Sequence, residues 1–242
     1  MIDFHSHILP GMDDGSKDAA QSIEMLLLAG AAETDTIVAT PHFQRRKETV
    51  DSFLERRRAA CIHLEEAMAG KDGFPQILLG AETEFFLGIG REAGIKKLCI
   101  PGTDCFLLEM PFCEWSSLVM NDIQALCCNR GLTPIIAHVE RFFRYRNSGK
   151  QIDALLELGC VLQTNAESVL CSRNRRKILH MIGNDEITLL GSDCHGITSR
   201  PPGLLEARRA VISKLGLQAA ERLDRHGEEL LNSARIGIDA DR

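Results

Sequence analysis

Two histidines near the start of the chain have the spacing of metal ligands on a β-strand. His5 and His7 lie in the mainly apolar run of residues 1–8, and side chains two positions apart on a strand point to the same side. Two neutral imidazoles that converge at a strand end form half of a transition-metal site. The turn-rich loop that follows adds two carboxylates, Asp13 and Asp14. A His-x-His pair alone is also compatible with two surface histidines that have no function. The rest of the chain decides between this interpretation and a metal site.

Ligand-type residues recur where the other predicted strands end. Short apolar or β-branched runs, separated by segments of helical period, predict seven strands at residues 1–8, 36–40, 76–79, 106–108, 134–137, 160–163 and 187–190. Six of these seven strands end in, or are closely followed by, His, Asp or Glu, and Asp14 lies in the loop after the first strand. The full set is His5, His7, Asp14, His42, Glu82, Glu109, His138, Asp193 and His195. Glu82 alone is compatible with a helix cap and His138 alone with a buried, hydrogen-bonded imidazole. Their recurrence at one edge indicates a shared site.

The alternation of strands and helices predicts the fold class. Such a pattern implies parallel strands with right-handed crossovers. A chain of 242 residues, of which 44% are hydrophobic, suits one packed domain spanning 1–242, about the size of a single α/β barrel. We therefore expect a distorted seven-stranded (β/α)7 barrel, with a doubly wound open sheet as the alternative. In an α/β barrel the carboxyl ends of the strands carry the active site.

Local signals refine two of the predicted helices. Asp18 is a predicted N-cap, with Gln21 at the capping-box position. Arg56, Arg57 and Arg58 fall in a long helical segment, and we expect them to be solvated.

Nine ligands exceed what one ion needs. A transition metal takes about four to six ligands, so this set suits two or three ions with bridging carboxylates. Imidazole and carboxylate donors without thiolate favour manganese, iron or zinc over magnesium or calcium. Four carboxylates do not neutralise three divalent ions, which leaves a positive pocket suited to a hydroxide and a phosphate dianion.

Composition excludes several other classes of protein. The net charge of −6 argues against a nucleic-acid partner. We expect no signal peptide and no membrane insertion, because basic and apolar leader regions and long apolar runs are missing. Nine scattered cysteines without a Cys-x-x-Cys pair suit reduced thiols in the cytoplasm. Whether the chain forms a homo-oligomer is left open.

Residues 5–15, His-Ser-His-Ile-Leu-Pro-Gly-Met-Asp-Asp-Gly, resemble the opening motif of the bacterial metal-dependent tyrosine phosphatases. These enzymes belong to the polymerase and histidinol phosphatase (PHP) superfamily and are encoded with capsule and exopolysaccharide genes. Further matches follow in family order over nearly the whole chain: Ala39-Thr40-Pro41-His42, Gly80-Ala81-Glu82, Leu108-Glu109-Met110-Pro111-Phe112, Ile136-Ala137-His138-Val139-Glu140-Arg141, Ser192-Asp193-Cys194-His195 and Arg200-Pro201-Pro202.

The resemblance implies a PHP-type barrel with a trinuclear, usually manganese-loaded site. By position it implies three ligand groups: His5, His7, Glu82 and Asp193; Glu82, Glu109 and His138; and Asp14, His42 and His195. It also implies that Arg141 and Arg200 bind phosphate as bidentate forks, and that His42 acts with them in catalysis. The implied reaction is attack of metal-bound hydroxide on phosphotyrosine, and the implied partner is a bacterial tyrosine kinase that controls polysaccharide synthesis.

Two positions depart from the family pattern. Val139 stands where the family commonly has proline. The loop of residues 43–48 lacks the usual aromatic or histidine and the Tyr-x-Asn, and instead carries Arg45, Arg46 and Lys47. These cations either favour an acidic peptide around phosphotyrosine or are simply solvated.

Two rival functions remain. The first is a thiol phosphatase, because Cys194 and Arg200 have the Cys-x5-Arg spacing. The following Pro201-Pro202 disfavours the usual helix, and Asp193 would raise the pKa of the thiol. The second rival is a small-molecule phosphatase of the same superfamily that acts on histidinol phosphate or a nucleotide.

Overall fold

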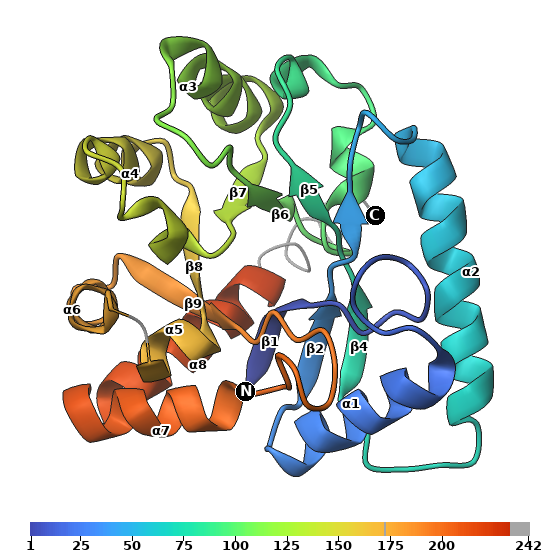
Figure 1. Cartoon of the computed structure of the whole chain (residues 1–242). Coiled ribbons are helices and arrows are strands. Elements are labelled where there is room, and N and C mark those ends of the chain that lie inside the picture. Colours follow the sequence, from blue (N-terminus) through green and yellow to red (C-terminus); the bar gives the residue numbers. More distant parts are fainter. Residues whose placement is uncertain (172, 233–242) are drawn as a thin grey trace, which may run out of the picture.

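The strands of the protein form two parallel sheets. The computed structural model describes residues 1–171 and 173–232. Its strands are β1 (Ile2–Ser6), β2 (Thr36–Ala39), β3 (His42–Phe43), β4 (Gln76–Leu79), β5 (Glu82–Glu84), β6 (Cys105–Glu109), β7 (Thr133–Ile136), β8 (Val161–Asn165) and β9 (Ile187–Gly191). One sheet has the order β1-β2-β4 and the other β3-β5-β6-β7-β8-β9 (Figure 1).

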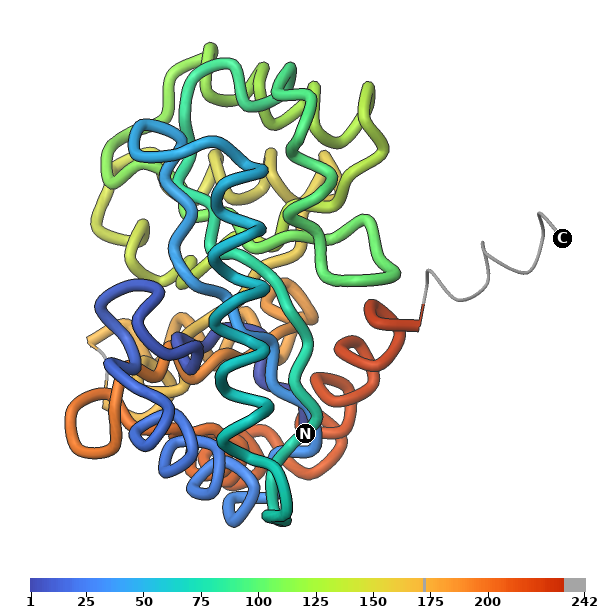
Figure 2. The backbone as a smooth tube through the Cα atoms, turned by 90° about the vertical axis from the view of Figure 1, so that its right-hand side faces the viewer, coloured from blue at the N-terminus to red at the C-terminus, as the bar shows by residue number. Residues whose placement is uncertain are grey.

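Helices surround the strands, and α2 runs along the length of the molecule (Figure 2). The α-helices are α1 (Ala19–Ala31), α2 (Val50–Met68), α3 (Ser117–Gln124), α4 (Ser148–Glu157), α5 (Ala166–Cys171), α6 (Arg175–Gly183), α7 (Leu204–Leu215) and α8 (Leu217–Asn232). Shorter 3₁₀ or π segments are η1 (Ile89–Arg91), η2 (Ile95–Leu98), η3 (Ala125–Asn129) and η4 (Val139–Phe142). None of these helices is long and apolar enough to cross a lipid bilayer.

Two of the seven predicted strands, 36–40 and 76–79, are each followed after a break by a further short strand, which gives nine strands in the described residues. Thr40-Pro41 separates β2 from β3, and Gly80-Ala81 separates β4 from β5. Proline has no N–H to donate to a ladder, yet the backbone contact continues, because the Pro41 carbonyl accepts from Glu82 N at 3.1 Å. The second halves then pair with each other, His42 opposite Glu82. The interruptions therefore pass these two chain segments from one sheet to the other.

The first and last strands meet on the other side. Ser6 and Cys194 form an isolated parallel bridge, Asp193 N donates to His5 O at 2.7 Å, and His7 N donates to Cys194 O at 3.0 Å. Gly191 makes the approach possible, since a Cβ there would lie 2.5 Å from His5 Cβ. The described residues form two parallel sheets, and no closed barrel is detected among them.

A small apolar core lies between strands of both sheets. Phe4 and Val38 come from the three-stranded sheet, and Leu107, Ile135 and Leu189 come from the six-stranded sheet. A larger buried cluster includes residues of the outer helices. The two sheets therefore share an interior, which fixes the relation between their carboxyl ends.

The local predictions have mixed outcomes. The Asp18 side chain caps α1 by accepting from Gln21 N at 2.9 Å, as predicted. The expectation that Arg57 is solvated was wrong: it is buried, and its guanidinium donates to Gly80 O. Helical geometry explains this outcome, because position 57 shares a face with the buried Phe53 and Leu64.

Candidate metal centre

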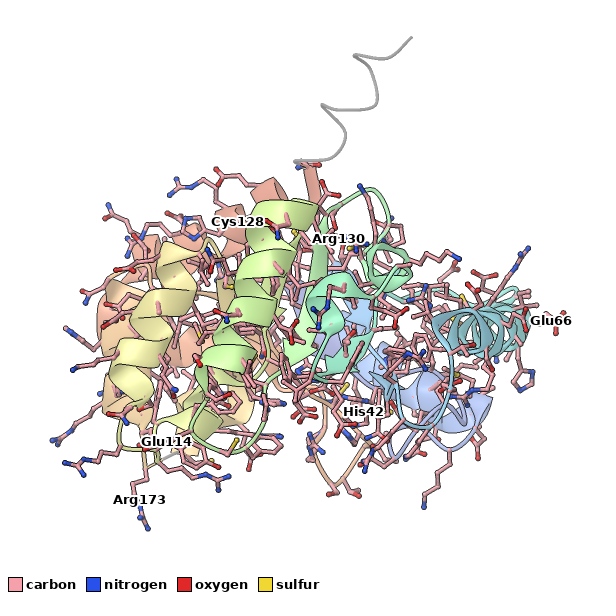
Figure 3. All side chains as sticks on the ribbon, turned by 90° about the horizontal axis from the view of Figure 1, so that it is seen from above. His42, Glu66, Glu114, Cys128, Arg130 and Arg173 are labelled. Carbon is pink, nitrogen blue, oxygen red and sulfur yellow. The ribbon has the colours of Figure 1, made fainter. Side chains whose placement is uncertain are left out.

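The structure brings all nine predicted ligands together at the carboxyl ends of the strands. They come from β1 and its following loop, β3, β5, β6, and the segments just after β7 and β9: His5, His7, Asp14, His42, Glu82, Glu109, His138, Asp193 and His195. Figure 3 shows His42 toward the middle of the molecule, whereas Glu66 of α2 lies at its outer edge. Residues as far apart in sequence as His5 and Asp193, or Asp14 and His195, thus become neighbours.

Glu82 is the most enclosed carboxylate of this cluster. Its Oε2 lies 2.9 Å from His42 Nδ1, 3.2 Å from His5 Nε2 and 3.3 Å from His7 Nε2. Its Oε1 lies 3.0 Å from His138 Nε2. Burial opposes ionisation, but the positive charge of His5 and the close contacts of His138 and His42 hold the pKa of Glu82 well below its usual range. A buried carboxylate among four imidazoles is a ready bridging ligand.

The geometry fits bound cations. Glu82 Oε2 is buried and has no hydrogen bond among the described residues, although three ring nitrogens converge on it. Two ligands of one ion, each about 2.1 Å from it and at right angles, are about 3 Å apart. The donor atoms form three groups, and within each group all atoms lie within 4.8 Å of one another. The groups are His7, Asp14, His42 and His195; His5, His7 and Asp193; and His42, Glu82 and Glu109. His138 joins the third group through Glu109, 3.3 Å away.

Two imidazoles of the cluster are tuned in opposite directions. Burial opposes the charged form of His138, but the carboxylates of Glu109 and Glu82 raise its pKa to about 9. Burial, together with the positive charges of His7 and Arg200, lowers the pKa of His195 to about 4. Without a cation the cluster therefore holds protons at pH 7, and a metal must displace them to bind.

Two arginines border the cluster at Asp193. Arg141 donates to Asp193 Oδ2 at 3.0 Å, and Arg200 forms an ion pair with the same oxygen. Both guanidinium groups remain more than one-third exposed, so they present free N–H groups beside the ligands. Asp193 and Arg200 have φ of 52° and 54°, and His138 has φ of 35°. Such left-handed backbone in non-glycine residues is typical of functional sites.

Three further side chains orient the ligands. The sequence indicated the Asp13 carboxylate in the first loop, but it did not identify Gln163 or Asn165 as site residues. Asp13 Oδ2 lies 2.7 Å from His7 Nδ1 and accepts from His42 N at 2.9 Å. Gln163 Oε1 lies 3.3 Å from His5 Nδ1, and Asn165 Nδ2 donates to Asp193 Oδ2 at 2.6 Å. The sequence did hold a signal for these two residues. Gln163 and Asn165 are two positions apart at the end of β8, so their side chains point to the same side, and this is the one predicted strand that ends without a metal ligand.

The loop of residues 43–48 divides its cations between two environments. Arg45 pairs with Glu92 at 3.0 Å, and Arg46 approaches Glu84 at 3.5 Å. Lys47 has no ion pair among the described residues, and it lines a depression of about 750 Å³ with Asp14 and His42. Simple solvation therefore does not describe Arg45 and Arg46, because both lie against carboxylates. Lys47, within the part of the chain that the structure describes, is left free beside the candidate centre.

Cys194 lacks the environment of a nucleophile. Its side chain is fully buried, and burial together with the nearby Asp3 carboxylate raises the pKa of its thiol to about 12. Reactive cysteines have a lowered pKa and partial exposure. The geometry therefore disfavours the thiol-phosphatase alternative.

Parallel α/β strands that end in a cluster of imidazoles and carboxylates define a metal-dependent α/β protein. The chain belongs to the CpsB/CapC family of capsular polysaccharide synthesis, whose sequence profile matches residues 1–231. Its relatives include the tyrosine-protein phosphatases CpsB of Streptococcus agalactiae and YwqE of Bacillus subtilis. CpsB is 25% identical, and the alignment covers 92% of this chain and 94% of CpsB. YwqE is 28% identical, and the alignment covers 98% of this chain and 93% of YwqE. CapC of Staphylococcus aureus is 30% identical, with 98% and 93% covered.

Solved structures agree with this assignment. A structure described with YwqE of Bacillus subtilis and CpsB of Streptococcus pneumoniae, metal-dependent tyrosine phosphatases, matches with a TM-score of 0.85 at 27% identity, covering 96% of this chain and 94% of that one. A TatD-like protein of Archaeoglobus fulgidus matches with a TM-score of 0.50 at 11% identity, covering 93% and 100%. The second likeness concerns the fold alone.

Proposed function

We propose that the chain is a metal-dependent protein-tyrosine phosphatase. Its proposed substrate is a phosphotyrosine protein, a bacterial tyrosine kinase that controls capsule or exopolysaccharide synthesis. The observation that carries the proposal is the convergence of three imidazoles on the buried, unbonded Glu82 Oε2, with Arg141 and Arg200 paired to Asp193 of the same cluster. The names of the relatives CpsB and YwqE support the choice of phosphotyrosine.

The proposed cofactor is a set of three divalent ions, most consistent with manganese, with iron and zinc as alternatives. Bound there, the ions would lower the pKa of a coordinated water and neutralise phosphate charge. The proposed groups are His5, His7, Glu82 and Asp193; Glu82, Glu109 and His138; and Asp14, His42 and His195. Mixed nitrogen and oxygen donors without thiolate support manganese, iron or zinc.

The remaining polar side chains bind and orient. Arg141 and Arg200 would hold the phosphate oxygens with the N–H groups that Asp193 leaves free. Asp13 and Gln163 would fix the ring nitrogens that face away from the centre, so that the opposite nitrogens stay free to ligate. His42 has the most exposed imidazole among the proposed ligands, with 28% of its side chain accessible, so it would also contact the substrate.

The wider predictions also remain proposals. We propose one domain over 1–242, arranged as a distorted seven-stranded barrel: the two interrupted strands join the sheets on one side, and the contact between β1 and Cys194 joins them on the other. We propose a cytoplasmic location, which the nine free cysteines support because reducing compartments keep thiols unpaired.

The test is hydrolysis of a phosphotyrosine peptide by chelator-stripped protein to which manganese, iron, zinc or magnesium is restored. We expect activity to vanish on stripping and to return best with manganese. His5→Ala and Asp193→Asn should each lose at least about a thousandfold in kcat, the scale of removing a main electrostatic element. Faster turnover of histidinol phosphate or a nucleotide would instead favour the small-molecule alternative.

A matched variant tests the thiol alternative. Cys194→Ser should keep more than about half of the wild-type kcat, because a buried thiol with a raised pKa cannot supply the attacking atom. Loss of activity in this folded, metal-loaded variant would contradict the proposal.

A further inference from the structure

Phe112 is a large apolar side chain that is exposed beside the candidate centre. It follows β6 in the segment Glu109-Met110-Pro111-Phe112, and 45% of its surface is accessible. Apolar residues this exposed are unremarkable when they are scattered over a surface. This one instead packs against two residues of the centre, and neither the proposed metal ligation nor phosphate binding uses its ring.

The ring of Phe112 lies on the edge of the centre in a defined orientation. It stacks on the imidazole of His138 with 5.9 Å between centroids and 25° between planes. The Arg141 guanidinium carbon lies 5.9 Å from the centroid of Phe112. On the same His138, Nε2 faces Glu82 and Glu109. The apolar ring thus adjoins both a proposed metal ligand and a proposed phosphate ligand.

The backbone around Phe112 is held in place. The Phe112 carbonyl accepts from the Tyr145 hydroxyl, and the Pro111 carbonyl accepts from Trp115 Nε1 at 3.0 Å. Phe142 stacks on Phe112 with 5.8 Å between centroids. A side chain fixed in this way loses little conformational freedom when a ligand binds. The exposed ring is therefore a preformed aromatic surface and not a loosely placed loop residue.

We propose that Phe112 is a specificity-determining residue that contacts the aromatic ring of the substrate and so favours aryl over alkyl phosphates. The inference rests on the proposed function, and it deepens it by assigning the aromatic selectivity to one side chain. An aromatic ring ester-linked to a phosphate held by Arg141 extends away from the phosphorus, and Phe112 offers a planar apolar partner at that edge. Offset stacking of two rings stabilises the complex beyond simple burial.

The test is calorimetric binding of phenylphosphonate and methylphosphonate to the manganese-loaded protein. Neither ligand can be hydrolysed, so the leaving group does not influence the comparison. We expect the wild type to prefer phenylphosphonate. Phe112→Ala should weaken phenylphosphonate about five- to tenfold, the range expected of one aromatic contact, and should change methylphosphonate less than about twofold. Phe112→Tyr should retain the preference.

Two controls separate this role from a purely structural one. If Phe112 only positions His138, Phe112→Ala weakens both phosphonates equally, and the proposal is overturned. Leu118→Ala, a change of an exposed aliphatic residue in α3, should leave both affinities unchanged. A wild type without preference for the phenyl ligand also contradicts the proposal. If neither phosphonate binds and phosphotyrosine is not hydrolysed, it is the proposed function that fails.

Discussion

At the scale of single residues, the centre depends on side chains that do not themselves face a cation. Asp13 Oδ2 contacts both the His7 imidazole and the backbone N–H of His42. Its other oxygen, Oδ1, accepts from Gly15 N at 2.9 Å. One carboxylate thus fixes one imidazole and the backbone of another. Outer partners of this kind set both the tautomer and the orientation of a ligand.

We expect Asp13→Ala to lower manganese affinity by about 10- to 100-fold, the usual effect of losing such a partner. The physical reason is that His7 Nδ1 and His42 N would lose their acceptor in a buried site. Asp13→Asn keeps an acceptor but loses the charge, so its effect should be smaller. Competition with a metal-binding dye measures both affinities. Unchanged affinity in Asp13→Ala would show that packing alone orients His7.

At the scale of secondary structure, the approach of β1 to β9 determines where the ligands meet. Gly191 ends β9 opposite His5, and a Cβ there would also lie 2.7 Å from Gln163 Nε2. Neither neighbour can withdraw without moving a ligand or its partner. The absence of a side chain at this position is therefore a requirement of the centre.

We expect Gly191→Ala to lower the free energy of unfolding of the metal-free protein by about 1–3 kcal/mol, the usual cost of overpacking. Gly149→Ala is the matched control: it lies in α4 with no atom within 4 Å of its added Cβ, and it should stabilise by about 0.5–1 kcal/mol. Urea unfolding in chelator measures both. Equal effects of the two changes would mean that the contact between β1 and β9 tolerates an extra methyl group.

The sequence predicts the elements better than their connections. Alternating strands and helices are local patterns, and the Asp18 cap is confirmed because it depends on residues three positions apart. The breaks at Pro41 and Gly80 could not be predicted in this way, because they depend on which strands pair on either side of each break: β2 with β4 before it, and β3 with β5 after it. The burial of Arg57 follows from the helix face that it shares with Phe53 and Leu64, but its hydrogen-bond partner, the carbonyl of Gly80, is distant in sequence and could not be predicted.

At the scale of the whole molecule, protons and cations compete for one cluster that joins both sheets. The pKa of His138 is raised to about 9, above the usual value of about 6.5 for an unfolded chain. A raised pKa contributes stability that is fully present below pH 6.5 and is lost as the pH rises through 9. Metal binding has the opposite dependence, because ligands must first lose their protons.

We therefore expect the chelated protein to lose roughly 1–3 kcal/mol of stability between pH 6.5 and 9. Manganese at about 100 times its dissociation constant at pH 6.5 should instead raise stability by about 2.7 kcal/mol over the chelated protein at that pH. At the same manganese concentration the gain should grow as the pH rises, because the ligands lose their protons. Chemical unfolding at several pH values tests both trends. In His138→Gln the loss in chelator should be reduced but not abolished, because the pKa values of His7 and His42 are also raised; an unaltered loss would assign it to those two groups.

The span of the centre from β1 to the segment after β9 also has a consequence for biosynthesis. A ribosome adds His5 before the other ligands, and the ligand set is incomplete until His195 has been added. The growing chain can offer only partial sets of ligands before then. The full set of cations can therefore bind only after the segment that follows β9 has been made and has folded against β1.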